Sequence, residues 1–271
     1  MRNDITIDIE GIRKMPDGSV RDAETIRQIA LYCIKNPNDK EISHKIYEPL
    51  SFVGLYPHIM TAYDIKPEDA KVDHFDKIEK ILNFSDEDKF YFLQIIKRRK
   101  DNPGMKKDLR LIDSFFIYTH SEFISYKERI KEICKQNNAR AYIRLNRRSA
   151  KVVALCTVSR IIENVSAGQY KNAKNAYQSC CGSTMKESDK TWICDFDYKD
   201  FPDDFKFTDM VRTIKDLQFE TGKEPLMLHL TTVNGFHLIT RPFNTKKFKD
   251  TYPNLKNFDI HKDSPTLLYK F

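Results

Sequence analysis

Two aspartates in the segment TWICDFDY, residues 191–198, have the spacing that most directly suggests chemistry. The segment reads as a strand, in which Asp195 and Asp197 project from the same face. Carboxylates about 7 Å apart on one face repel each other, and a bound divalent cation relieves that repulsion. Oxygen ligands favour Mg²⁺ or Mn²⁺, which bind through one or two carboxylates plus substrate phosphates. The alternative is a solvent-facing strand whose aspartates bind nothing.

A histidine and an arginine follow on a predicted hairpin at residues 225–243. Its turn is expected at Asn234-Gly235, the strongest short hairpin signal in the chain. His237 and Arg241 share one face of the second strand, and an imidazole beside a guanidinium suits a triphosphate. A histidine among hydrophobic residues more often has a structural role, so that alternative stays open.

A two-metal site needs a third acid, and two candidates lie near the C-terminus. Asp263 precedes Ser264-Pro265, where the alternative is a turn aspartate that bonds its own backbone. Asp259 shares a strand face with His261. Asp263 is the first choice, and Asp259 remains an alternative.

The order of these motifs resembles the three-motif pattern of the archaeo-eukaryotic primase superfamily. That pattern consists of a D-x-D, a small residue two positions before a histidine, and a later lone acid. Here it corresponds to Asp195 with Asp197, to Gly235 with His237, and to Asp263 or Asp259. The resemblance covers residues 111–271. It implies an α/β unit joined to an RRM-like unit with the active site between them.

The resemblance also implies an activity. Asp195, Asp197 and the third acid would hold Mg²⁺ or Mn²⁺, and His237 would contact the phosphates of a nucleoside triphosphate. The chain would then be a primase-polymerase-like nucleotidyltransferase that makes a primer or extends a strand on a nucleic-acid template by two-metal catalysis. A metal-dependent nuclease is the alternative enzyme. A catalytically inactive primase-fold protein that binds nucleic acid or serves in assembly is the third alternative.

Three arginines after a predicted strand at residues 139–146 are candidates to bind a template or primer backbone. Arg144, Arg147 and Arg148 surround Asn146. The alternative is that these arginines form a capping cluster at the start of the next helix, which is expected at residues 149–165. Positive charge is mildly unfavourable there, which favours the nucleic-acid role.

The periodicity of the chain predicts an α+β protein. Residues 1–110 are expected to be mainly helical, with no assigned role beyond supporting the core or recruiting a replicative helicase or another replication protein. Residues 111–185 read as an α/β sub-unit, with a strand at 111–119 and a helix at 121–137 capped by Ser121. Residues 190–271 read as an RRM-like β-α-β-β-α-β sub-unit whose last two strands, at 258–262 and 266–269, are expected to pair.

Composition sets broad limits on the function. The chain has 271 residues, 46 Lys and Arg against 39 Asp and Glu, and a net charge of +7, which permits phosphate partners without requiring them. No stretch approaches a membrane span, and the first twenty residues contain no signal-peptide core, so a cytoplasmic protein is expected, with a viral or mobile-element origin left open. Six scattered cysteines indicate neither a disulfide framework nor a zinc site, so reduced core cysteines are expected.

Overall fold

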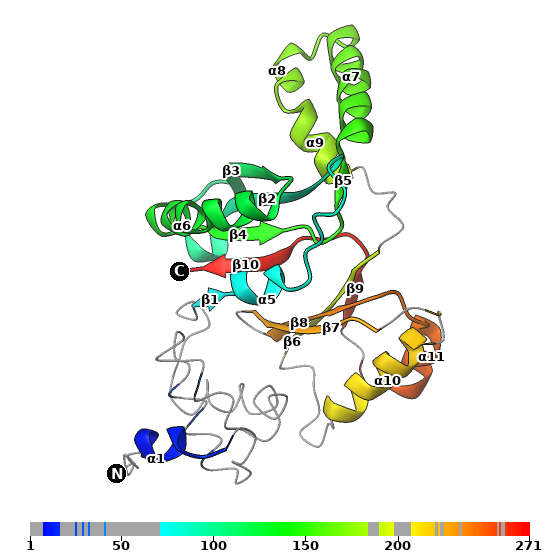
Figure 1. Ribbon diagram of the computed structural model, residues 1–271. Coiled ribbons are helices and arrows are strands. Elements are labelled where there is room, and N and C mark those ends of the chain that lie inside the picture. Colours follow the sequence, from blue (N-terminus) through cyan, green and yellow to red (C-terminus); the bar gives the residue numbers. More distant parts are fainter. Residues whose placement is uncertain are drawn as a thin grey trace.

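The computed structural model describes residues 8–16, 25, 29, 32, 41, 71–183, 190–197, 207–219, 222, 225–232, 235–253, 255 and 258–271. The expected break between sub-units at residues 182–190 lies mostly outside these residues, and its first two residues end a helix, α9. The described elements are α1 Ile9–Arg13, β1 Val72–Asp73, α5 Phe75–Glu79, β2 Lys89–Arg98, the 3-10 helix η2 Arg99–Asp101, β3 Leu109–Ile117, α6 His120–Asn137, β4 Arg140–Ile143, β5 Arg148–Ser149, α7 Ala150–Ser166, α8 Tyr170–Ala173, α9 Ala176–Ser183, β6 Trp192–Asp197, α10 Phe207–Phe219, β7 Met227–Thr231, β8 Gly235–Thr240, α11 Thr245–Thr251, β9 Asp259–His261 and β10 Thr266–Lys270. The protein is thus α+β, with two antiparallel sheets (Figure 1).

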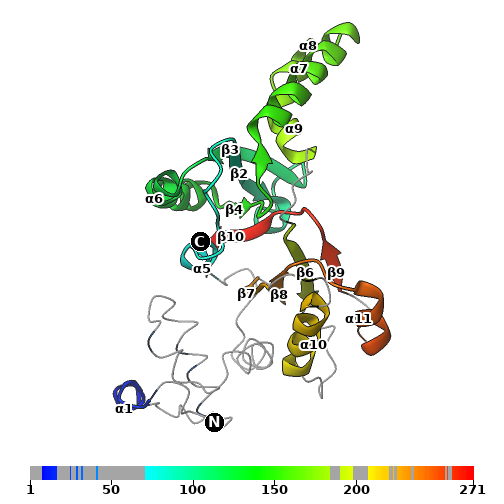
Figure 2. The same ribbon diagram turned by 45° about the vertical axis from the view of Figure 1, so that its right-hand side comes forward.

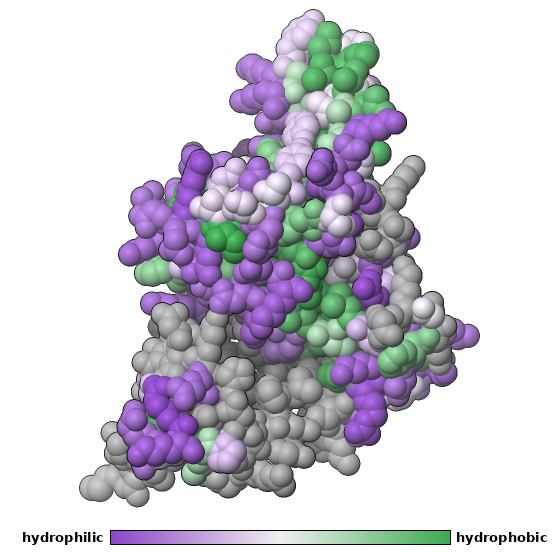
Figure 3. All heavy atoms as spheres, viewed as in Figure 1, coloured by the Kyte–Doolittle hydropathy of each residue, from purple (hydrophilic) through white to green (hydrophobic). Residues whose placement is uncertain are grey.

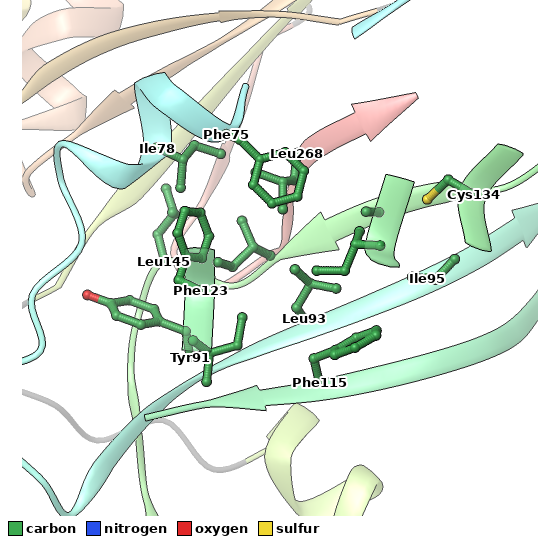
Figure 4. Close-up of a cluster of buried hydrophobic side chains, with 14 of the residues drawn as sticks. Phe75, Ile78, Tyr91, Leu93, Ile95, Phe115, Phe123, Cys134, Leu145 and Leu268 are labelled. Carbon is green, nitrogen blue, oxygen red and sulfur yellow. The ribbon is translucent and has the colours of Figure 1, made fainter. Parts of the chain in front are cut away.

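The first sheet has the strand order β1-β10-β4-β2-β3, and β5 pairs with the outer part of β2. One face packs on α5 and α6 around a core that includes Phe75, Leu93, Phe123 and Leu268 (Figure 4). The aromatic residues of the opposite face pack against α7 and α9. Both faces of the central strand are therefore covered.

The central strand β2 lies within residues 71–110, part of the region that is expected to be mainly helical; most of residues 17–70 lie outside the described residues. β2 spans residues 89–98 and pairs with both β3 and β4. The expected boundary at residue 110 falls inside β3, which pairs with β2. The misreading has a physical cause: the run FYFLQII is buried on both sides of the sheet, so it lacks the alternation that marks a half-buried strand.

The second sheet has the order β7-β8-β6-β9, with β6 at its centre. The helices α10 and α11 cover one face, where Phe196, Phe236 and Leu238 are buried, as the alternation of the hairpin predicts. The other face contributes Ile193 and Ile239 to the core of the first sheet. The two sheets therefore pack together through this second face (Figure 2).

The last strand does not pair with its predecessor, so the expected final strand pair is wrong. β9 pairs with β6 in the second sheet, whereas β10 lies between β1 and β4 in the first sheet. The chain crosses from one sheet to the other at residues 262–265. Leu267 and Leu268, on opposite faces of β10, are both buried. A position inside the first sheet provides this burial on both faces, whereas a terminal hairpin would not.

A buried polar cluster holds this crossing in place. Asn146 donates from Nδ2 to the backbone carbonyls of Thr191 (3.1 Å) and Lys262 (2.9 Å), and its Oδ1 accepts from the Thr191 N–H (2.7 Å). Arg148 Nη2 lies 2.6 Å from Asp263 Oδ2. We call Asn146, Arg148 and Asp263 the crossing cluster, because it fixes the chain where it enters and leaves the second sheet.

A buried histidine forms a second link between the sheets. His74 precedes α5, and its Nε2 donates to the Thr231 carbonyl at the end of β7 (2.7 Å). Burial lowers the pKa of His74 to about 4, against the backbone hydrogen bond, which acts in the opposite direction. His74 is therefore neutral in the folded protein at neutral pH.

The projecting hairpin of α7 and α9 contains a disulfide, which corrects the expectation of reduced cysteines for one pair. Cys156 of α7 bonds Cys180 of α9 over a Cα separation of 5.9 Å. Cys134, Cys181 and Cys194 are free and buried, as expected. A contact between residues 24 positions apart leaves no local sequence pattern.

The cap of α6 yields the first prediction. Thr119, rather than the expected Ser121, caps this helix, in a capping box with Glu122. Thr119→Ala should lower the free energy of unfolding by about 1 kcal/mol, because the helix loses a hydrogen bond to a terminal N–H group. Ser121→Ala, at an exposed position, is the matched control and should change it by less than about 0.5 kcal/mol in urea unfolding. Equal effects would contradict the assignment.

The neutral state of His74 yields the second prediction. A group whose pKa is depressed on folding binds its proton preferentially in the unfolded chain, so stability is lost as pH falls below the unfolded value of about 6.5. His74→Gln keeps a side-chain donor for Thr231 but cannot titrate. The loss of unfolding free energy between pH 7 and pH 5 should therefore be about 2 kcal/mol smaller in the variant. An identical pH dependence in urea unfolding would contradict a buried neutral His74.

Candidate nucleotide site between the two sheets

Asp195 lies at the centre of the candidate site because its strand has neighbours on both sides. On β6 it stands opposite His237 of β8 and opposite Asp259 of β9. Directly opposed residues of an antiparallel pair project from the same face. The face of the second sheet that is turned toward the first sheet therefore carries Asp195, His237 and Asp259.

Asp197 shares this face, as its spacing from Asp195 predicts. The residue opposite it is Gly235, so no side chain stands beside the carboxylate on β8. A Cβ at position 235 would collide with the backbone carbonyl of Phe196. Gly235 therefore belongs to β8 rather than to the expected turn, and glycine is required there for β8 to approach β6.

His237 is held between the two sheets. Its Nε2 lies 3.4 Å from Asp195 Oδ1, and its Nδ1 lies 2.8 Å from the hydroxyl of Thr266, the first residue of β10. A proton on Nε2 suits the contact with Asp195, and Nδ1 shares a hydrogen bond with the hydroxyl of Thr266. The imidazole is 13% exposed, so its orientation is fixed by contacts from both sheets.

The charges around Asp195 favour its ionised form. Burial would raise the pKa of its carboxyl, but the hydrogen bond and charge of His237, together with the charges of His261 and Lys100, outweigh burial and lower the pKa below its ordinary value. Its side chain is 41% exposed, so solvent and ligands can reach it. The site thus presents an accessible carboxylate.

Two basic groups near Asp195 were not singled out by the sequence. His261 of β9 places Nε2 3.9 Å from Asp195 Oδ2. Lys100 of η2 is close enough that its charge interacts with both Asp195 and Asp197, and desolvation holds its own pKa below the usual range. The period of β9 put His261 on the face of Asp259, but only the fold brings Lys100 across from the first sheet.

The third predicted acid, Asp263, lies in the crossing cluster. Its Oδ2 is 2.6 Å from Arg148 Nη2 and 3.6 Å from Arg144 Nη1, and its backbone carbonyl also accepts from Arg144. Two guanidinium groups therefore already balance this carboxylate. Asp259, the alternative, is exposed and directly opposite Asp195, so it is the acid that the fold adds to the pair.

The three arginines do not form the exposed nucleic-acid surface that the sequence suggested. Arg148 is 1% exposed, and its Nε donates to the Cys181 carbonyl (2.6 Å). Arg147 is 9% exposed and donates to the Asn83 carbonyl (3.2 Å). Arg144 bonds Asp263, and burial lowers the pKa of its guanidinium against the opposing effect of Asp263. These guanidinium groups connect loops and strands inside the molecule.

Arg241 lies just beyond the end of β8. Its backbone N–H donates to Gln218 Oε1 of α10 at 2.9 Å, and the same oxygen accepts from the N–H of Leu226. Gln218 is fully buried. β8 thus ends at Thr240, so the strand face of His237 does not continue to Arg241 as the sequence suggested.

The donor set fits a cation that arrives with its substrate better than one bound in a complete protein cage. Within the described residues, no group of three or more His, Cys, Asp or Glu side chains is arranged to hold a metal ion. Asp195 and Asp197 nevertheless offer hard oxygen donors on one face, and Cys194 points to the other. Mg²⁺ and Mn²⁺ sites of this kind take one or two carboxylates and complete their coordination with substrate phosphates and water.

Comparison with known proteins identifies no relative: no protein-family model, curated protein or solved structure matches this chain. In the part of the chain that the structure describes, no helix is both long and apolar enough to cross a bilayer. The function must therefore be argued from the site itself.

The two late acids yield a prediction that separates their roles. Asp263→Asn should lower the free energy of unfolding by about 3 kcal/mol or more, because it leaves the buried Arg148 without its counter-charge. Asp259→Asn, the matched control, should be neutral or slightly stabilising, since it removes a like charge opposite Asp195. Urea unfolding of both variants measures the difference, and similar losses would contradict this division.

Proposed function

We propose that the chain is a metal-dependent nucleotidyltransferase that extends or primes a nucleic-acid strand from nucleoside triphosphates. The observation that carries the proposal is the contact between Asp195 and His237, with Asp197 and Asp259 on the same face of the sheet. A pair of carboxylates beside a fixed imidazole suits a triphosphate with its cation.

The topology of the second sheet supports the same proposal. Its chain order is β-α-β-β-α-β, its first strand lies between the third and the fourth, and both helices cover one face. This order is compatible with the RRM-like unit that the resemblance implies, and it supports the proposal in that sense. The candidate residues lie on the face that α10 and α11 leave uncovered, which is turned toward the first sheet. The resemblance to the archaeo-eukaryotic primase superfamily implies an active site at this position.

The side chains have distinct roles in the proposed reaction. A divalent cation, when bound, would supply charge stabilisation for the transferred phosphoryl group and a lowered pKa for the attacking hydroxyl. Asp195 and Asp197 would hold it, with Asp259 available on the same face. His237, fixed by Thr266, would present its Nε2 proton to a phosphate oxygen, and Lys100 would add positive charge from the first sheet.

A nuclease is the second candidate, and His261 favours it. His261 approaches Oδ2 of Asp195, whereas His237 approaches Oδ1. Two imidazoles around one carboxylate could serve as base and acid in phosphodiester hydrolysis. The same side chains could serve a nucleotidyltransferase or a nuclease, so the two enzymes are distinguished by their substrate.

An assay with a labelled primer-template, nucleoside triphosphates and Mg²⁺ or Mn²⁺ tests the proposal. The wild-type chain should extend the primer, and Asp195→Asn and Asp197→Asn should each reduce extension by roughly 100-fold or more, because each removes an oxygen donor for the cation. Asp216→Asn on α10, an exposed aspartate on the helix-covered side of the sheet, is the control and should retain activity.

The outcomes distinguish the candidates. Cleavage of the labelled strand that depends on Asp195 would establish the nuclease instead. Nucleic-acid binding with neither extension nor cleavage, and with no effect of either aspartate variant, would establish a non-catalytic assembly protein.

A further inference from the structure

The helix α7 exposes an apolar stripe along most of its length. Leu155, Val158 and Ile162 are 64%, 58% and 60% exposed, and Val152 and Val165 extend the stripe toward the two ends. Leucine and isoleucine side chains in adjacent turns of one helix face form a continuous surface. We call these five residues the α7 stripe.

The opposite side of α7 is already occupied. Val153 is buried, Cys156 bonds Cys180 of α9, and Arg160 donates to Ser179 of α9. The hairpin of α7, α8 and α9 projects away from the two sheets in both views (Figures 1 and 2). Hydrophobic residues gather on the outer side of this projection (Figure 3), so the stripe is placed where another molecule can reach it.

Four of the five stripe residues are arranged symmetrically about a point beside Val158, which indicates what covers the stripe. The point between Val158 and Ser159 divides it so that Val152 mirrors Val165 and Leu155 mirrors Ile162. A two-fold interface brings the same patch of both subunits together in opposite directions. In an antiparallel pair of α7 helices, Val152 would lie opposite Val165 and Leu155 opposite Ile162.

The charges of α7 fit the same arrangement. Lys151 lies in the first turn and Glu163 in the last turn, which is the unfavourable order for the dipole of a single helix. In an antiparallel pair, Lys151 of one copy lies beside the last turn of the other copy, near its Glu163. The orientation that is unfavourable within one helix thus becomes favourable between two.

We infer that α7 is the contact surface through which two copies of this chain pair, antiparallel, about the centre of the stripe. Burial of the stripe on both copies removes on the order of 1,000 Å² of surface, the lower limit for a specific interface. The dimer is therefore reversible, with dissociation in the micromolar range. The disulfide to α9 and the contact of Arg148 with Cys181 hold the helix in a fixed position, which favours association.

Sedimentation velocity of the full chain between about 1 and 100 μM provides the first test. The wild type should shift from monomer to dimer over this range. Leu155→Glu and Ile162→Glu should each weaken association at least 10-fold, because a charge enters the apolar centre of the contact twice, once from each copy. Leu109→Glu, at an exposed leucine of β3 (55% exposed), is the matched control and should leave it unchanged. A monomer at every concentration would overturn the inference.

A charge exchange separates pairing between copies from binding to another partner. Lys151→Glu and Glu163→Lys alone should each weaken the dimer, since each places like charges together. The double variant should restore it, because the exchanged charges face each other again. Failure of the double variant to recover would overturn the antiparallel arrangement. Co-sedimentation with lipid vesicles in place of dimer formation would overturn pairing altogether.

Site-specific cross-linking tests the register. Ser159→Cys lies beside the two-fold axis and should form a disulfide between copies under mild oxidation. Val165→Cys should not do so alone, because it lies opposite Val152 of the other copy, but the Val152→Cys, Val165→Cys double variant should. Circular dichroism melting of each variant, together with the monomer mass, checks that the fold is intact. Cross-linking of Val165→Cys alone would indicate a parallel pair and contradict the inference.

Discussion

The buried contact among Asn146, Arg148 and Asp263 is the constraint on which the arrangement of this molecule depends. The chain enters the second sheet after Thr191 and leaves it after Lys262, and Asn146 bonds the backbone at both points. Arg148, without exposed surface, neutralises the carboxylate that begins the return to the first sheet. A buried ion pair tolerates little displacement, because separation would leave a charge without a partner or water. The two sheets are therefore fixed relative to each other.

This constraint determines which face of the second sheet is available for chemistry. The helices α10 and α11 bury one face, and the other contributes Ile193 and Ile239 to the core of the first sheet. The same face continues past this core to Asp195 and Asp197, where the packing becomes polar. His237 marks the transition, because Thr266 of the first sheet holds one ring nitrogen and Asp195 lies near the other. The candidate site is thus built at the edge of the contact that joins the sheets.

The acids near the C-terminus divide between structure and chemistry according to their partners. Asp263 faces two arginines that neutralise it, whereas Asp259 lies exposed opposite Asp195. The sequence suggested that Arg144, Arg147 and Arg148 bind nucleic acid. In the structure, Arg144 and Arg148 contact Asp263 of the crossing cluster, and Arg147 donates to the carbonyl of Asn83. Positive charge at the candidate site comes instead from Lys100 of η2, which follows β2 of the first sheet. The exposed apolar residues of α7, by contrast, lie on the hairpin that projects away from the two sheets, so the proposed association and the proposed chemistry would use separate surfaces.

The sequence alone determined the local geometry: alternation placed Asp195 and Asp197 on one strand face, the hairpin pattern placed His237 on the neighbouring strand, and Ser149 marked the start of α7. Only the tertiary structure decided what these elements meet. β2 lacks alternation because both of its faces are covered, β10 pairs across the molecule, and Arg148 finds Asp263 115 residues away. Periodicity indicates which side of a helix or strand is buried, but it does not indicate which other element packs against that side. That choice depends on packing and charge balance over the whole chain.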